Sequence, residues 1–139
     1  MTPQQLASTH AAAFTQARPW RADEFADLLA QPHIHLIGTP MCFALFQVIT
    51  DEAELLTLAT HPTRQRLGLA TKCMVSWHNK AICLGATRAL LEVASDNLAA
   101  LSLYERCGYQ PCGRRKAYYP RQNGKKCDAI VMERSLTQR

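Results

Sequence analysis

The feature that most constrains the fold is an apolar run at residues 41–49, MCFALFQVI, in which Gln47 alone is polar. Gly38-Thr39-Pro40 marks a turn before this run, and a second strand-like segment, HIHLI, precedes the turn. A short segment that is apolar at nearly every position is typical of a strand covered on both faces. We therefore expect a central sheet with helices packed on each side.

Helical patterns flank this run. A first helix is expected from Thr2-Pro3, an N-cap followed by proline, and a second after Pro19-Trp20, with acidic residues in its first turn. Two more are expected at 68–84 and 97–107, each ended by a glycine. The apolar faces of the first three helices are predicted to carry, in order, Leu6, His10 and Phe14; Phe25, Leu28 and Leu29; and Leu69, Cys73, Trp77, Ala81 and Leu84.

Extended patterns fill the remaining segments. Asp51-Glu52 is expected to turn the chain into the next strand. Strands are expected at 54–60, 88–94, 109–119 and 126–136. The resulting order, two helices, three strands, helix, strand, helix and two strands, predicts an α/β protein that forms a single domain over residues 1–139.

Composition narrows the class of protein. The chain is 47% hydrophobic and 19% charged, which is typical of a globular protein. It has no apolar run of the roughly 18 residues that span a bilayer, and its start lacks a basic segment followed by an apolar core. We therefore expect a cytoplasmic protein without membrane contact. The net charge of +5 favours an anionic partner, whether a nucleotide, a nucleic acid or an acidic protein.

The six cysteines form no C-x-x-C pair, and several lie in apolar segments. We expect reduced thiols that pack as small apolar side chains, and neither disulfides nor a zinc site. His33 and His35 could share one strand face, but no third ligand is evident from the spacing. We therefore expect no metal site.

A basic loop at residues 61–71, HPTRQRLGLAT, leads from a predicted strand into a predicted helix. It lacks the second glycine and the lysine of a Walker motif, and the three glycines of a dinucleotide fingerprint. Helix N-termini nevertheless bind anions through unpaired N–H groups, and Gly68 would let a ligand approach the backbone closely. Two readings stay open from spacing alone: a diphosphate site backed by Arg64 and Arg66, and a basic surface loop.

Four segments in order resemble the GCN5-related N-acetyltransferase (GNAT) family, and within it the RimI type, the ribosomal-protein-alanine N-acetyltransferases. They are RPWRADEF, the QRLGLA loop, LEVASDN with LYERCGY, and GRRKAYY before DAIVME, so the resemblance covers nearly the whole chain. It implies the GNAT fold, a central mixed, mostly antiparallel sheet of about six to seven strands, with a splayed central strand pair and helices on both faces. The chain departs from the family at Arg21, where a serine cap is usual, at Ala70, where glycine is usual, and at Ala117, where asparagine commonly precedes the paired tyrosines.

The resemblance also implies acetyl-coenzyme A as cosubstrate. Its diphosphate would lie in the cradle formed by Gln65, Arg66, Leu67, Gly68, Leu69, Ala70 and Thr71. The backbone of Leu58, Ala59 and Thr60 would bind the pantetheine arm at a bulge that splays the two central strands. Asn97 would hydrogen-bond the same arm.

Direct acetyl transfer needs a neutral amine and a proton for the departing thiolate. Glu92 lies within the apolar strand LLEV, where burial would raise the pKa of its carboxyl toward neutrality. The residue by itself favours an exposed glutamate on an edge strand, but the resemblance implies that it is the base. Tyr104 shares a helix face with Asn97 and Ala100, and its phenol would protonate the sulfur; the alternative is a core tyrosine beside a capping asparagine. A covalent cysteine route through Cys107 or Cys112 is not expected.

The acceptor is the least constrained part of the prediction. The resemblance implies the N-terminal amine of a protein, the N-terminal alanine of a small-subunit ribosomal protein, with Tyr118 or Tyr119 closing over it. Another protein N-terminus, a lysine or a small amine would suit the same chemistry, and a coenzyme- or RNA-binding module without turnover is the non-enzyme alternative. Residues 114–119, RRKAYY, could suggest nucleic-acid binding, but strand alternation would send these side chains to opposite faces, so direct binding is not expected.

Overall fold

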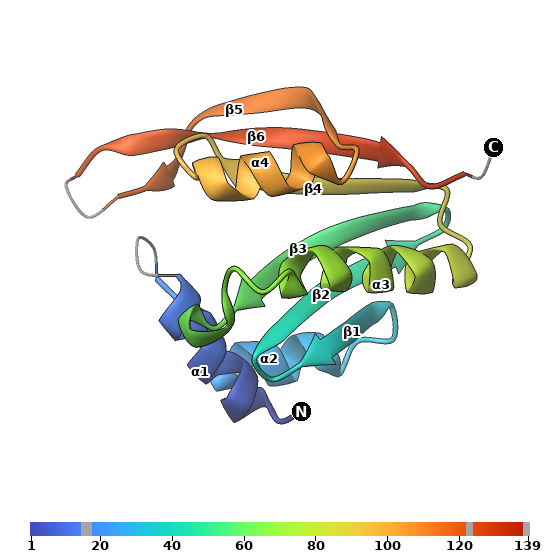
Figure 1. Ribbon diagram of the computed structural model, residues 1–139, viewed down its shortest axis with the longest axis horizontal. Helices are drawn as coiled ribbons and strands as arrows, with labels where there is room; N and C mark the ends of the chain where they lie inside the picture. Colours follow the sequence, from blue (N-terminus) through green and yellow to red (C-terminus); the bar gives the residue numbers. More distant parts are fainter. Residues whose placement is uncertain (15–17, 122–123, 138–139) are drawn as a thin grey trace.

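The computed structural model describes residues 1–14, 18–121 and 124–137. Within these residues, six strands form one sheet in the order β1-β2-β3-β4-β6-β5 (Figure 1). Each neighbouring pair is antiparallel except β3 and β4, which run parallel. The strands are β1 (Ile34–Thr39), β2 (Cys42–Ile49), β3 (Glu52–Thr60), β4 (Arg88–Ala94), β5 (Gln110–Pro120) and β6 (Lys126–Ser135). The predicted mixed, mostly antiparallel sheet is therefore confirmed.

The helices cover both faces of this sheet, as the apolar run at 41–49 predicted. They are α1 (Pro3–Ala13), α2 (Ala22–Leu29), α3 (Leu69–Cys83) and α4 (Leu98–Arg106), with a short 3-10 turn at Pro62–Arg64. Leu6 of α1 and Phe25 of α2 pack with Phe43 and Leu45 of β2. The alternate β2 residues belong to a second cluster on the α3 and α4 side. Alternation along one strand therefore supplies two cores.

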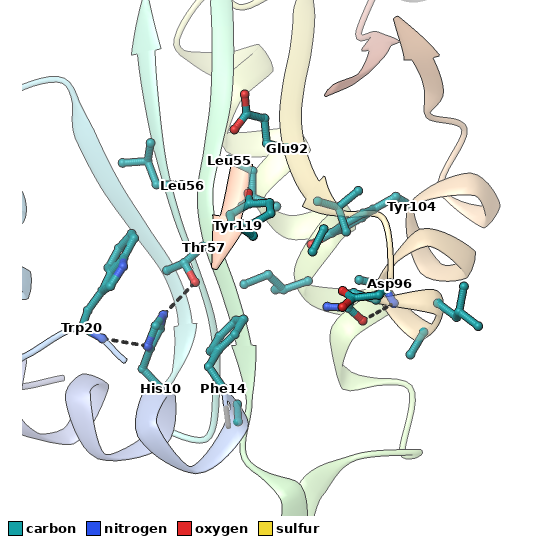
Figure 2. A pocket seen from close by; sticks show the side chains of 18 of the residues that line it. His10, Phe14, Trp20, Leu55, Leu56, Thr57, Glu92, Asp96, Tyr104 and Tyr119 are labelled. Atoms are coloured by element: carbon teal, nitrogen blue, oxygen red, sulfur yellow. Dashed lines mark hydrogen bonds between the residues drawn. The ribbon is translucent and has the colours of Figure 1, made fainter. Parts of the chain in front are cut away.

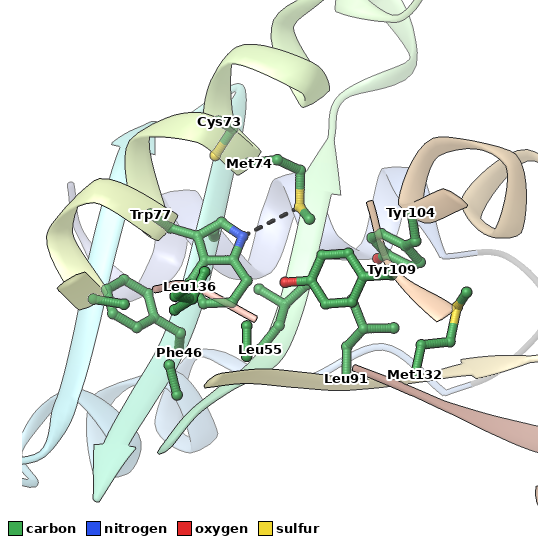
Figure 3. Packing of buried hydrophobic residues seen from close by; sticks show 14 of the residues in the cluster. Phe46, Leu55, Cys73, Met74, Trp77, Leu91, Tyr104, Tyr109, Met132 and Leu136 are labelled. Carbon is green, nitrogen blue, oxygen red and sulfur yellow. Dashed lines mark hydrogen bonds between the residues drawn. The ribbon is translucent and has the colours of Figure 1, made fainter. Parts of the chain in front are cut away.

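The larger core lies between the sheet and helices α3 and α4 (Figure 3). Trp77 of α3 is fully buried, contacts the ring of Phe46 at 5.2 Å, and donates its indole N–H to the Met74 sulfur at 3.2 Å. Cys42 and Cys73 belong to this cluster, so they pack as small apolar side chains, as expected.

Two details of the expected elements are wrong. Leu84 was placed on the buried face of the third helix, but it is the C-cap residue and is 38% exposed. Asp51-Glu52 was expected to form the turn into β3, whereas Glu52 already pairs with Ile49 across the hairpin. The predicted helix ended one residue too late, and the predicted strand began too late. Both errors lie at the end of an element, where side-chain spacing is least informative.

The two central strands pair over a short length only. β3 and β4 are joined at Glu52–Arg88, Ala53–Ala89 and Glu54–Leu90, and no further pairs are recorded along the described part of either strand. Beyond these pairs the strands diverge, as Figure 1 shows. From residue 55 to 60, the edge of β3 that is turned toward β4 therefore has no strand partner. The predicted splay is confirmed.

A bulge in β3 accompanies the splay. Leu45 pairs with Thr57 and Phe46 pairs with Leu55, so Leu56 is the extra residue. Before the bulge, Leu55 packs in the core beneath α3; after it, Ala59 packs in the core beneath α1 and α2. The extra residue thus turns Thr57 toward the α1 and α2 side of the sheet.

Candidate active site

A cavity of about 600 Å³ opens between the separated strands β3 and β4 (Figure 2). Residues 55–58 of β3 and 92–94 of β4 form two of its walls. The start of α4 closes a third side, and α1 with the segment after it closes a fourth. Of the predicted site residues, the structure brings four together here: Leu58, Glu92, Asn97 and Tyr104.

Glu92 reaches the cavity because β4 alternates. Leu91 and Val93 are buried in the core under α3 and α4, so the side chain of Glu92 lies on the opposite face. Its carboxylate forms an ion pair with Arg115, with 2.8 Å between Oε2 and Nε, and its side chain is 22% exposed. The sequence suggested apolar surroundings for this carboxyl, but the structure places a cation against it.

Tyr104 lies on the inner face of α4 and is 8% exposed. Burial, with smaller contributions from Cys107 and Tyr119, raises the pKa of its hydroxyl, so the phenol stays protonated at neutral pH. Its ring contacts Tyr109, with 6.1 Å between centroids. Within the described part of the chain, no hydrogen bond occupies the hydroxyl, which leaves its proton available to a group in the cavity.

Asn97 is the N-cap of α4, so the capping alternative considered for it is correct as a structural role. Its side-chain oxygen accepts the Ala100 N–H at 3.2 Å. The side chain also lines the cavity, and an asparagine amide has two further donors on its nitrogen. Capping and ligand binding are therefore compatible.

The remaining predicted coenzyme residues lie outside this cavity. Ala59 and Thr60 continue β3 beyond Leu58, and residues 65–71 form the loop and first turn that follow. Gln65 was expected to offer its amide to a ligand; one N–H of that amide donates to the Thr60 carbonyl at 3.2 Å, and the amide nitrogen carries a second N–H. Gln65 therefore fastens the loop to the end of β3.

The start of α3 has the geometry of an anion site. Gly68 is its N-cap in the left-handed region, at φ 77°, and provides no side chain to cap the helix. The first intrahelical bond runs from the Lys72 N–H to the Gly68 carbonyl at 3.2 Å, so three N–H groups precede it, those of Leu69, Ala70 and Thr71. Arg66, also left-handed at φ 65°, is a cationic residue two positions before Gly68.

The sequence reasoning missed the polar pair His10 and Thr57. The imidazole lies between the rings of Phe14 and Trp20, at centroid distances of 4.3 and 5.1 Å (Figure 2). His10 Nδ1 accepts the Trp20 backbone N–H at 3.2 Å, and Nε2 lies 3.2 Å from Thr57 Oγ1. Burial lowers the pKa of His10 to about 4, against a smaller opposing effect of Glu24. The available signal was a histidine on the apolar face of an amphipathic helix.

Of the two candidate tyrosines, Tyr119 lines the cavity, whereas Tyr118 is 48% exposed and stacks under Arg115 at 5.2 Å. Arg121 lies 5.8 Å from the Tyr119 ring and pairs with Asp96 at 2.7 Å. That ion pair links the end of β5 to the loop before α4.

Among the described residues, no group of three or more His, Cys, Asp or Glu side chains could hold a metal ion. In the same residues, no helix is both long and apolar enough to cross a membrane.

Comparison with known proteins agrees with this geometry. A sequence model of the acetyltransferase (GNAT) family matches residues 5–109. The [ribosomal protein bS18]-alanine N-acetyltransferase of Escherichia coli K12 is 32% identical over 130 residues, which cover 91% of this chain and 87% of that protein. The crystal structure of the E. coli ribosomal-protein-S18-alanine N-acetyltransferase superposes with a TM-score of 0.87 at 28% identity, over 99% of this chain and 89% of that one.

A more distant structure shares the fold alone. Arabidopsis thaliana NAA60 in complex with acetyl-CoA has a TM-score of 0.80 at 16% identity, over 97% of this chain and 95% of that one. Because the family match spans most of the chain and the E. coli relative covers nearly all of it, the chain belongs to the GNAT acetyltransferase family and is an N-acetyltransferase.

Proposed function

We propose that this protein transfers the acetyl group of acetyl-coenzyme A to the N-terminal alanine of a small-subunit ribosomal protein. The observation that carries the proposal is a cavity at the strand splay that Glu92 and Tyr104 both line. The E. coli relative is named for acetylation of alanine in ribosomal protein bS18, which supports this acceptor class. We further propose that residues 1–139 act as one catalytic domain in the cytoplasm.

The coenzyme would enter along the edge of β3. Its diphosphate would accept hydrogen bonds from the free amides at the start of α3, where the helix dipole and Arg66 favour negative charge. Residues 58–60 have a backbone edge without a β4 partner, which suits the amides of the pantetheine arm. Asn97 would meet that arm from the other side of the splay. The thioester would then lie inside the cavity.

Glu92 would act as the base. An N-terminal ammonium has a pKa of about 7.7–8.0, so its deprotonation near neutral pH needs little driving force. The carboxylate would receive this proton, directly or through one water, and the neutral amine would attack the thioester carbonyl. Arg115, which holds the carboxylate at 2.8 Å, would keep it oriented toward the cavity on the face opposite α3.

Tyr104 would act as the acid. When the tetrahedral intermediate collapses, the carbon–sulfur bond breaks and the sulfur leaves as a thiolate. The Tyr104 hydroxyl would give its proton to that sulfur, and burial keeps the hydroxyl protonated until then. The products are the acetylated amine and coenzyme A, and the protons balance between Glu92, Tyr104 and solvent.

The test uses acetyl-coenzyme A and peptides that differ only in their first residues, with thiol release as the assay. We expect Glu92→Gln and Tyr104→Phe each to lower kcat about 100-fold while coenzyme binding stays near that of the wild type. Glu133→Gln is the matched control, because Glu133 also pairs with an arginine, at 2.6 Å from Arg88, but does not line the cavity. Unchanged turnover in either site variant would remove that residue's role.

The peptide series tests the acceptor. Peptides that begin with alanine should have the highest kcat/KM, and the same sequence with an acetylated N-terminus and an internal lysine should give no thiol release. Faster acetylation of lysine side chains or small amines would overturn the N-terminal assignment while leaving acetyl transfer intact.

A further inference from the structure

The hydrogen bonds around His10 fix the position of its proton. A neutral imidazole has one N–H and one acceptor nitrogen. Nδ1 faces the backbone N–H of Trp20, which can only donate, so Nδ1 must be the acceptor. The proton therefore lies on Nε2, which donates to Thr57 Oγ1 at 3.2 Å. The flanking rings of Phe14 and Trp20 hold the imidazole plane in place.

This arrangement determines what Thr57 can do. Its hydroxyl oxygen accepts from His10, so its own proton must point elsewhere. Among the described residues, no second hydrogen-bond partner of this hydroxyl is recorded, and its cross-strand neighbour Leu45 is apolar. Thr57 lines the cavity, although it is only 8% exposed. The hydroxyl is thus an unused donor that faces the cavity.

The face of the sheet indicates which ligand this donor meets. After the Leu56 bulge, Thr57 lies on the α1 and α2 side, and Glu92 lies on the face of β4 opposite the α3 and α4 core. Tyr104 approaches from α4, on the other side. A molecule whose amine reaches Glu92 therefore lies on the Thr57 side of the cavity, and the leaving sulfur lies on the Tyr104 side.

We propose that Thr57 donates a hydrogen bond to the carbonyl oxygen of the acceptor's first peptide bond, and that His10 is the positioning residue that directs the Thr57 hydroxyl there. The inference rests on the proposed function, because it assumes a peptide acceptor. It names a specificity element: an acceptor with a carbonyl next to its amino-bearing carbon gains this contact, whereas a lysine side chain or a simple amine does not.

The His10 imidazole must stay neutral for Nε2–H to donate to Thr57 while Nδ1 accepts from Trp20. The charged group that acts on His10 is Glu24 of α2, which raises the pKa of His10 and pairs at 2.8 Å with Arg18, a further residue that lines the cavity. Burial outweighs Glu24 and keeps the imidazole neutral at physiological pH. A charged imidazole would donate from both nitrogens and would lose the Trp20 contact.

The test compares two acceptor peptides of one sequence, one with its first carbonyl replaced by a thiocarbonyl, which accepts hydrogen bonds poorly. We expect the wild type to prefer the normal peptide about fivefold in kcat/KM. Thr57→Val should nearly abolish this preference, and Thr57→Ser should retain it. A general packing defect in Thr57→Val would slow both peptides equally and leave their ratio unchanged. If Thr57→Val retains the full preference for the normal peptide, the inference is therefore overturned.

His10 is tested in the same way. His10→Phe keeps the ring stack but removes the Nε2 donor, and we expect it to lose the preference as Thr57→Val does. The double variant should lose no more than either single variant. Retention of the full preference in His10→Phe would mean that His10 does not act through Thr57.

A measurement on the protein without peptide separates this inference from the proposed function. Nitrogen-15 NMR of His10 should show protonation on Nε2 alone between pH 6 and 8. An Nδ1-protonated ring would overturn the inference even if alanine peptides are acetylated normally. Failure of the wild type to acetylate any peptide would overturn the acceptor proposal and this inference together.

Discussion

Two buried histidines on opposite faces of the sheet make the same pattern of hydrogen bonds. His10 accepts from the Trp20 N–H and lies 3.2 Å from the Thr57 hydroxyl; His78 accepts from the Arg134 guanidinium at 3.0 Å and lies 2.7 Å from the Tyr109 hydroxyl. Both are 4% exposed, and burial lowers the pKa of each to about 4. Each ring is therefore neutral and donates to a hydroxyl.

The two pairs differ in what lies beyond the hydroxyl. Tyr109 belongs to the core shown in Figure 3 and is 3% exposed, so its bond to His78 fixes helix α3 against the chain after α4. Thr57 belongs to the cavity wall. The same device therefore stabilises the fold on the packed side of the sheet and, by our inference, orients a ligand donor on the open side. The surroundings, and not the bond, decide between the two roles.

The largest expected effect is on stability at mildly acidic pH. Because the folded pKa of each histidine, about 4, is below the unfolded value of 6.5, the unfolded chain binds more protons between these pH values. The histidine contribution is complete above pH 6.5 and is lost as the pH falls toward 4, by up to about 1.4 kcal/mol per pH unit for each ring. Urea unfolding at pH 7 and 5 should show a fall of about 4 kcal/mol for the two together.

Single variants sharpen this prediction. His10→Gln and His78→Gln should each remove about half of the pH dependence. The ion-paired carboxylates Glu24 and Asp96 contribute little between pH 7 and 5, because their ordinary pKa values of 4.5 and 3.8 already lie below this range, and their arginine partners lower both pKa values further, to about 2. If only His78→Gln changes the slope, His10 titrates normally and the two sites are not alike.

The next effect separates the two hydroxyls. Tyr109→Phe leaves the His78 Nε2–H unpaired in a closed core, which should lower the free energy of unfolding by about 1–3 kcal/mol. Thr57→Val leaves the His10 Nε2–H beside a cavity that water can enter, so the loss should stay below about 1 kcal/mol. Only Thr57→Val should alter discrimination between the normal and thiocarbonyl peptides. Equal losses of stability would mean that the cavity wall is as closed as the core.

The sequence predicted the elements well because the signals for them are local. Side-chain periodicity, caps and turn residues lie within a few positions of each other, and they placed nearly every helix and strand. The order of motifs also predicted the splay between β3 and β4. Gln65 shows what motif reasoning leaves out, since one N–H of its amide also donates to the Thr60 carbonyl, a contact within the chain that the motif does not predict.

The missed parts of the site depend on contacts far apart in the chain. His10 and Thr57 are 47 positions apart, and only the packing of α1 against the sheet joins them. Their meeting also requires the Leu56 bulge, because regular alternation would have turned Thr57 to the other face. Nothing in LLTLAT marks the position of an extra residue. A further irregularity, in β5 between Arg115 and Tyr119, likewise breaks the alternation that was assumed for RRKAYY.

The smallest expected effect concerns backbone strain at two residues, one in a turn away from the cavity and one in a strand beside it. Thr50, in the turn between β2 and β3, and Ala117, in the irregular part of β5, have φ values of 58° and 51°, where a Cβ is disfavoured and asparagine is better tolerated. The family's usual asparagine at position 117 fits this conformation. Thr50→Asn and Ala117→Asn should each raise the free energy of unfolding by about 0.5–1 kcal/mol, measured by urea titration.

Their kinetics should differ, since Thr50 lies in a turn away from the cavity. Ala117 lies between Arg115, which pairs with Glu92, and Tyr119, which lines the cavity, and its N–H is held by Asp128 at 2.8 Å. Relaxing its backbone should shift both neighbours slightly. We therefore expect Ala117→Asn to change peptide kcat/KM about twofold with coenzyme binding unaltered, and Thr50→Asn to change neither. A kinetic change in Thr50→Asn alone would show that strain in the distant turn, and not in β5, is coupled to the open side of the sheet.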